Sequence, residues 1–117
     1  MTNLELVAAE LAEAKKKHPK FVDSLLPSEK NCPANWYDEE LEMSRRRLAE
    51  AVAGKHCDLH HILQCEGYEA FSAYAHGDLA HARQELAQCA AVCLRAMEHI
   101  EKEMEETKCK SSDSFAN

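Results

Sequence analysis

Apolar residues along the chain recur with the period of helices, and the first such run lies near the N-terminus. Thr2 and Glu5 precede it with the spacing of a capping box, and Lys15–Lys17 end it where positive charge meets the negative end of a helix. His18-Pro19 then breaks the pattern, which predicts a first helix over about residues 3–17. The expected apolar face of this helix consists of Leu4, Val7, Ala8, Leu11 and Ala14.

A connector without helical periodicity follows over residues 18–35 and contains Pro27 and Pro33. Asn35 can cap a second helix that begins at Trp36, and Gly54 is expected to end it. Apolar residues of the connector are expected to anchor it on the core, and these are Phe21, Val22, Leu25 and Leu26.

The last two predicted helices form an antiparallel hairpin. Asp58 can cap a third helix that runs to about Ala75, and Gly77 then breaks the chain. Asp78 can cap a fourth helix that continues to about Glu105.

Composition agrees with one all-α domain. Of 117 residues, 45% are hydrophobic and 30% are charged, with three glycines and three prolines, which is a globular and helical balance. We therefore expect a bundle of four main helices over residues 1–106, with a central antiparallel helical hairpin. Residues 107–117 have too little apolar content to pack and are expected to form a disordered polar tail.

Charge and hydropathy limit the possible partners. The net charge of −7 and the pI near 5.5 argue against binding to nucleic acid or to an anionic membrane, since both favour positive proteins. No apolar run reaches the roughly 20 residues that cross a bilayer. We therefore expect a cytoplasmic protein whose six cysteines are reduced thiols.

Two carboxylates fall on the inward face of the third predicted helix. Glu66 lies in the middle of its apolar stripe and Glu69 lies at the edge. A buried carboxylate is costly unless a cation or hydrogen-bond donors compensate it. The stripe itself is formed by Leu59, Ile62, Leu63, Ala70 and Ala73.

The fourth helix carries Glu85 and Gln88 on the flank of its own apolar stripe. Both pairs lie at similar distances from Gly77, so the hairpin can bring the four side chains together. Oxygen ligands of this kind suit Mg²⁺ or Mn²⁺. The alternative is that Glu66 hydrogen-bonds a Tyr or His inside the bundle and that Glu85 is solvated. The apolar stripe consists of Leu79, Leu86, Ala90, Cys93, Met97, Ile100 and Met104.

Residues 45–103 resemble the MazG-like nucleotide pyrophosphohydrolases of phages and bacteria. The resemblance lies in HILQCEGYEA (61–70), in Gly77-Asp78 and in RQELAQCAAV (83–92). In that family an EExxE motif and a later ExxD motif bind Mg²⁺, and the enzymes cleave nucleoside triphosphates to monophosphate and pyrophosphate. Glu66, Glu69 and Glu85 match three of the ligands, which implies that they are the catalytic and metal-binding residues.

Two positions depart from the family motifs. Cys65 replaces the first Glu of EExxE, and Gln88 replaces the Asp of ExxD, so Gln88 would be a weak fourth ligand that lacks the negative charge. The sequence therefore supports two hypotheses. One is a Mg²⁺- or Mn²⁺-dependent nucleoside triphosphate pyrophosphohydrolase, and the other is a non-catalytic oligomeric binding or regulatory protein of phage or prophage origin.

The resemblance also implies a homodimer or homotetramer and a pocket for the nucleotide. Trp36, Tyr37 and Arg45–Arg47 are candidates for contacts with the base or phosphates, although core and surface roles are open for each. A separate group of cysteines and histidines near the start of the third helix raises a further alternative, a transition-metal or redox site, against simple packing and surface roles. Its members are His56, Cys57, His60, His61 and Cys65.

Overall fold

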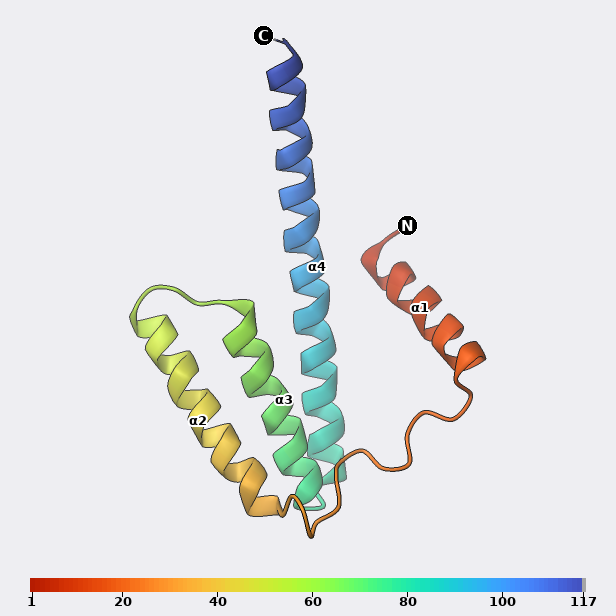
Figure 1. Cartoon of the computed structure of the whole chain (residues 1–117), viewed down its shortest axis with the longest axis vertical. Coiled ribbons are helices and arrows are strands. Elements are labelled where there is room, and N and C mark those ends of the chain that lie inside the picture. Colours follow the sequence, from red (N-terminus) through yellow and green to blue (C-terminus); the bar gives the residue numbers. More distant parts are fainter. Residues whose placement is uncertain (117) are drawn as a thin grey trace. The chain divides into compact units, whose positions relative to one another are not determined.

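The structure, a computed structural model, describes the backbone of residues 1–116 and the side chains of residues 1–109. Every regular element in this described part is a helix, which confirms the predicted all-α class (Figure 1). The helices are α1 (Asn3–Lys17), α2 (Ala34–Ala53), α3 (Leu59–Ala75) and α4 (Leu79–Ala116).

The chain divides into two compact units. One unit is Val22–Val92, and the other combines Met1–Phe21 with Cys93–Asn117. Helix α4 runs through both, so the single domain expected over residues 1–106 stays a prediction.

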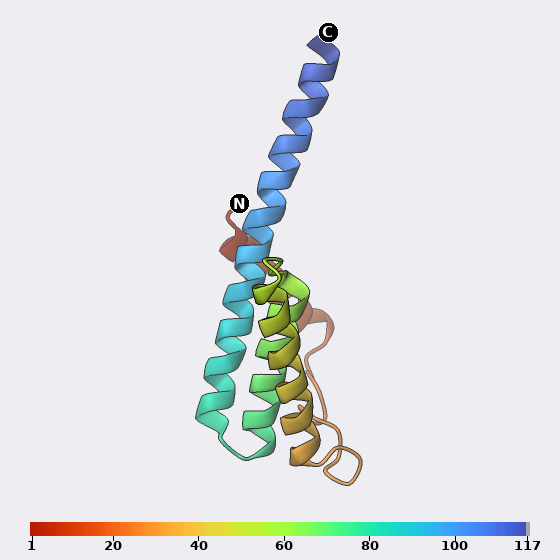
Figure 2. The same ribbon diagram turned by 90° about the vertical axis from the view of Figure 1, so that its left-hand side faces the viewer.

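Within the Val22–Val92 unit, α3 lies between α2 and the first part of α4, and the chain reverses between α3 and α4 (Figures 1 and 2). Gly77 makes the reversal possible, because its φ of 80° lies in the left-handed region that glycine adopts without strain. The predicted antiparallel hairpin is therefore present. The buried side chains of the Val22–Val92 unit are small, apart from those of Tyr37 and Leu41 on α2 and Glu85 on α4.

A polar cluster ties α2 to α3. The hydroxyl of Ser72 donates a 2.6 Å hydrogen bond to Asp38, and His76 Nε2 lies 2.8 Å from the other carboxylate oxygen of Asp38. Ser72 is buried, so this bond is shielded from water on one side. This cross-helix contact could not be predicted from local sequence patterns, because the residues are far apart along the chain.

Most predicted helix ends are confirmed. Thr2 accepts a hydrogen bond from the Glu5 backbone N–H at 3.1 Å, and Asp58 accepts one from the His61 N–H at 2.8 Å. Asp78 accepts one from the His81 N–H at 3.2 Å. Each side chain thus satisfies a backbone donor that the first turn of its helix leaves free.

The start of α2 was predicted wrongly. Pro33, not Asn35, precedes the helix, and its carbonyl already accepts the Trp36 N–H at 3.0 Å. Pro33 has an extended backbone, with φ of −70° and ψ of 162°, which leads directly into a helix beginning at Ala34. Asn35 therefore lies within the first turn.

The connector does not pack as predicted. Among the four apolar residues expected to anchor it, only Leu26 is partly buried, while Phe21, Val22 and Leu25 are exposed. Local hydrogen bonds of Ser24 and Ser28 shape this segment instead.

Helix α4 is longer than predicted. It continues past Glu105 to Ala116, so it includes most of the segment 107–117 for which a disordered polar tail was expected, and residue 117 lies outside the described residues. No Gly or Pro occurs after Gly77, and Glu105, Glu106 and Lys108 favour helix, so nothing in the sequence stops it. None of the described helices is long and apolar enough to cross a bilayer.

The covered face of α4 also differs from the prediction. Glu85 is only 7% exposed, as is typical of core residues, whereas Leu86 of the expected core stripe is 47% exposed. Ala82 and Glu85 lie on the buried side of the helix, and the apolar stripe lies beside it. The side of α4 that carries Glu85, predicted to be a flank, is therefore the buried face of the helix. Much of the apolar stripe that was expected to be buried is exposed.

In the other unit, α1 contains no buried residue. The side-chain amide of Asn3 donates a hydrogen bond to Glu101 on the C-terminal part of α4.

Candidate metal centre

Three carboxylates converge between α3 and α4. Glu66, Glu69 and Glu85 each place one oxygen so that the three atoms lie within 4.8 Å of one another. An octahedral Mg²⁺ holds its oxygens about 2.1 Å from the ion, so opposite ligands are roughly 4.2 Å apart. Small side-chain movements would therefore let all three oxygens bind one ion. The sequence prediction that the hairpin brings these residues together is supported by this geometry.

Local structure explains the convergence. Glu66 and Glu69 are separated by about one turn of α3, so their side chains emerge on the same side of that helix. Glu85 lies on the covered face of α4, as far after Gly77 as Glu69 lies before it. The antiparallel hairpin thus places Glu69 and Glu85 at the same level.

Gln88 completes the group from the next turn of α4. With the amide oriented so that its nitrogen donates, that nitrogen lies 3.2 Å from Glu66 Oε2 and 3.2 Å from Glu85 Oε2. A carboxamide can present either its N–H₂ or its carbonyl oxygen to the same place. Gln88 can therefore donate to the carboxylates without an ion and offer an oxygen ligand with one.

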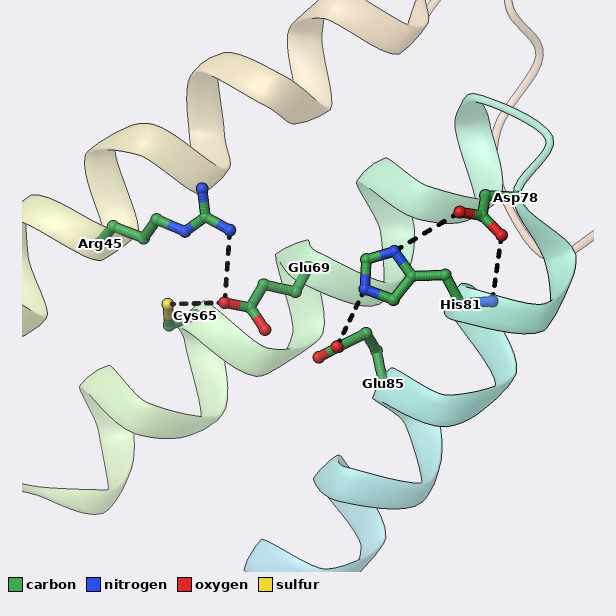
Figure 3. A network of polar contacts seen from close by, with 6 residues as sticks. All are labelled: Arg45, Cys65, Glu69, Asp78, His81 and Glu85. Carbon is green, nitrogen blue, oxygen red and sulfur yellow. Dashed lines mark hydrogen bonds and ion pairs between the residues drawn. The ribbon is translucent and has the colours of Figure 1, made fainter.

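Arg45 and Cys65 contact the third carboxylate, Glu69 (Figure 3). The guanidinium of Arg45, from α2, lies 3.5 Å from Glu69 Oε1. The buried thiol of Cys65 lies 4.0 Å from the same oxygen, a long contact even for sulfur. Arg45 was a candidate from the sequence, but its pairing with Glu69 could not be predicted, because it depends on how α2 packs on α3.

His81 holds Glu85 from within α4. Its Nε2 lies 3.1 Å from Glu85 Oε1, and its Nδ1 lies 3.7 Å from Asp78 (Figure 3). His81 was not among the site residues predicted from the sequence. Its spacing of four positions before Glu85 was a usable signal, because such pairs meet on a helix surface.

Burial and neighbouring charge alter the titration of the group. Burial, followed by the hydrogen bond and charge repulsion with Glu85, raises the pKa of Glu69, and Arg45 opposes this. Burial and then the Glu69 charge raise the pKa of the Cys65 thiol. The carboxylates are thus crowded in a partly dry place, where a cation would relieve their repulsion.

A cavity of about 400 Å³ opens beside these carboxylates. Its wall combines cationic and hydrogen-bonding groups with two of the carboxylates, and all its residues belong to the Val22–Val92 unit. They include Arg45, Glu69, Ser72, His76, His81 and Glu85.

The other nucleotide-contact candidates lie elsewhere. Tyr37 is buried among aromatic rings, at 5.1 Å from Trp36 and 6.2 Å from Phe71 between ring centroids. Arg46 pairs with Glu42 at 3.1 Å on the surface, and Arg47 is exposed. Neither Trp36 nor Tyr37 lines the cavity beside the carboxylates.

The cysteines and histidines at the start of α3 do not assemble into a metal site among the described residues. His61 Nδ1 is 2.7 Å from Asp58, the cap of the same helix, and Cys57 is exposed. Cys65 faces Glu69 instead. The alternative roles in helix capping and packing account for these contacts.

Comparisons of the chain with protein-family models, with curated proteins and with solved structures gave no match. The resemblance to MazG-like proteins therefore stays a prediction from the sequence.

Proposed function

We propose that this chain is a divalent-cation-dependent nucleoside triphosphate pyrophosphohydrolase, which converts a triphosphate to a monophosphate and pyrophosphate. The observation that carries the proposal is the convergence of Glu66, Glu69 and Glu85 within 4.8 Å, beside a cavity that also contains Arg45. Acidic residues from two helices bind an ion, and the cavity next to it accommodates a substrate that carries negative charge.

Hard oxygen ligands favour Mg²⁺ or Mn²⁺ in this site. Such an ion supplies Lewis-acid chemistry, because it activates water and neutralises charge on phosphate oxygens. Glu66, Glu69 and Glu85 are its proposed ligands, with the carbonyl oxygen of Gln88 as a weaker fourth. One of the three carboxylates accepts the proton of the attacking water.

The chain's cationic groups bind the phosphates. Arg45 pairs with Glu69 at 3.5 Å, and binding of an ion to Glu69 weakens that pairing. The guanidinium is then free to contact phosphate oxygens from the wall of the cavity. His76 and His81 also line the cavity, but their Nε2 atoms already contact Asp38 and Glu85, so Arg45 is the main phosphate-binding group in this proposal.

A specific observation favours the second candidate, a non-catalytic binding or regulatory protein. The Gln88 amide can satisfy both Glu66 and Glu85 at 3.2 Å, so these carboxylates have a neutral partner and do not require an ion for the helices to pack.

The test measures Mn²⁺ binding by calorimetry and pyrophosphate release from a panel of canonical and modified nucleoside triphosphates. Glu66→Gln should abolish both, whereas the matched change Glu39→Gln at an exposed position of α2 should leave both intact. Absence of Mn²⁺ binding and of pyrophosphate release in the wild-type protein would reject the hydrolase and favour the non-catalytic protein.

A further inference from the structure

The C-terminal part of α4 has an open apolar face. Cys93, Met97, Ile100 and Met104, here called the seam, recur at intervals of four, three and four residues. Met97 is partly buried, but Ile100 is 54% exposed and Met104 is 66% exposed, so the described residues leave the later part of this side of the helix largely uncovered. Removing such side chains from water is favourable, so covering the seam with a partner would stabilise the protein.

The spacing identifies the kind of partner. Alternation of three and four residues is the heptad repeat, which keeps an apolar stripe facing a second helix in a coiled coil. The same spacing extends back along α4 to Leu86 and Ala90, and no Gly or Pro interrupts the helix. The stripe therefore fits a partner helix of matching periodicity.

Helix α1 does not supply that cover. Its apolar residues Leu4, Val7 and Leu11 are exposed themselves. Among the described side chains, α1 reaches this part of α4 through the hydrogen bond from Asn3 to Glu101.

Charges beside the seam fit a second copy of the same helix. Glu103 and Lys108 lie on opposite flanks of the seam, five positions apart, and both are exposed. In a parallel, in-register coiled coil, a residue on one flank of the seam in the first helix lies beside the residue five positions later, on the opposite flank, in the second helix. Glu103 of each chain then faces Lys108 of the other, twice per pair. An antiparallel pair brings like flanks together and forms neither contact.

We propose that α4 binds α4 of a second copy of this chain along the seam, as a parallel, in-register coiled coil. The arrangement buries Met97, Ile100 and Met104 against their counterparts and places the two Cys93 side chains opposite each other. This arrangement assigns a surface to the homodimer that was expected from the sequence. It involves none of the proposed metal ligands, so it can be tested independently of the proposed function.

The first test measures the mass of the full chain in solution by sedimentation equilibrium. Wild type should be a dimer, and Ile100→Asp should weaken association by roughly 100-fold, because each dimer would bury two unpaired carboxylates. The control Lys102→Asp makes a larger charge change on the opposite side of the helix and should leave the dimer intact. Circular dichroism checks that both variants remain helical.

The second test determines whether the two α4 helices pair in parallel and in register. Copper-catalysed oxidation by oxygen, which removes two electrons and two protons from a pair of thiols, should link the chains through Cys93. Cys93→Ser should prevent the link, whereas Cys109→Ser should not.

Three results would overturn the proposal. They are a monomeric wild type, a dimer that survives Ile100→Asp, and a dimer that does not link through Cys93. A monomer that Ile100→Asp destabilises would assign the seam to contacts within one chain.

Discussion

The side-chain amide of Gln88 on α4 reaches Glu66 on α3, with 3.2 Å between the donating nitrogen and Glu66 Oε2. The same nitrogen reaches Glu85 at 3.2 Å, so one neutral side chain joins two carboxylates across the hairpin. Gln88 therefore stabilises the hairpin when no ion is bound, and it does so at the position where an additional carboxylate would strengthen a metal site.

Gln88→Asp should strengthen metal binding and weaken the hairpin when no metal is bound. A fourth carboxylate adds negative charge and a hard ligand, so affinity for Mn²⁺ should rise about tenfold, which corresponds to about 1.4 kcal/mol. Without metal, the loss of two hydrogen bonds and the added repulsion should lower the free energy of unfolding by about 1–2 kcal/mol. Calorimetric titration and urea unfolding measure the two effects.

Gln84→Asp is the matched control for that variant, because Gln84 is exposed on the same helix. It should change neither quantity appreciably. Unchanged or weaker Mn²⁺ binding in Gln88→Asp would argue that the carboxylates do not form an ion site.

Arg45→Ala should separate the binding of ion and nucleotide. Removal of the cation beside Glu69 should leave Mn²⁺ binding without nucleotide unchanged or a few-fold tighter. It should raise the KM for the triphosphate roughly tenfold, because a charge-assisted contact to phosphate is lost. Steady-state pyrophosphate release at saturating Mn²⁺ measures the second effect.

Arg46→Ala tests whether the effect of Arg45→Ala on the KM depends on the location of the arginine beside the cavity or only on its charge. Arg46 pairs with Glu42 on the exposed side of α2 and does not line the cavity, so its removal should leave the KM unchanged. Equal effects at the two arginines would contradict the role given to Arg45.

Asp38→Asn should lower stability at neutral pH and have a smaller effect in acid. Hydrogen bonds from Ser72 and then His76 lower the pKa of Asp38 below its ordinary value of 3.8. The stabilisation is therefore fully present above about pH 4 and is lost as the pH falls through the lowered pKa. Because Asp38 is partly exposed, we expect a loss of about 1 kcal/mol at pH 7.

Urea unfolding of wild type and Asp38→Asn across this pH range measures the difference. Glu39→Gln, which changes an exposed neighbour on α2, provides the baseline. A difference that is as large in acid as at pH 7 would mean that ionised Asp38 is not the stabilising species.

Tyr37→Phe should leave the free energy of unfolding unchanged or raise it by up to about 1 kcal/mol. Tyr37 is 3% exposed, and its hydroxyl makes no hydrogen bond of normal geometry to the described residues. Its polar neighbour is the thiol of Cys32, a weak partner, so folding removes the hydroxyl from water without full replacement. Burial and then the neighbouring Cys32 raise its pKa, as expected for such a hydroxyl.

Tyr37→Ala supplies the contrast, because it also removes the ring and its contacts with Trp36 and Phe71. It should cost about 3 kcal/mol in thermal or urea unfolding. A loss of more than about 1 kcal/mol in Tyr37→Phe would show that the hydroxyl is bound to a partner.

The sequence predicted the features that depend on neighbouring residues. Thr2, Asp58 and Asp78 begin their helices as expected, because a capping side chain binds backbone groups two or three positions away. The convergence of Glu66, Glu69 and Glu85 was predictable for a related reason, since one turn at Gly77 determines the level at which they meet.

Features that depend on packing were not predictable in the same way. Glu85 was expected on a flank because Leu86 and the other apolar residues dominate the helical pattern, yet α3 covers the side of α4 that carries Glu85. The end of α4 was predicted too early at Glu105, because polar residues such as Glu105 and Lys108 also favour helix.

The short turn around Gly77 has a consequence for how the carboxylate group comes to exist. All four proposed ligands lie within residues 66–88, so the chain closes only a small loop to bring them together and loses little entropy in doing so. The group can therefore assemble early in folding, ahead of contacts that involve the distant connector.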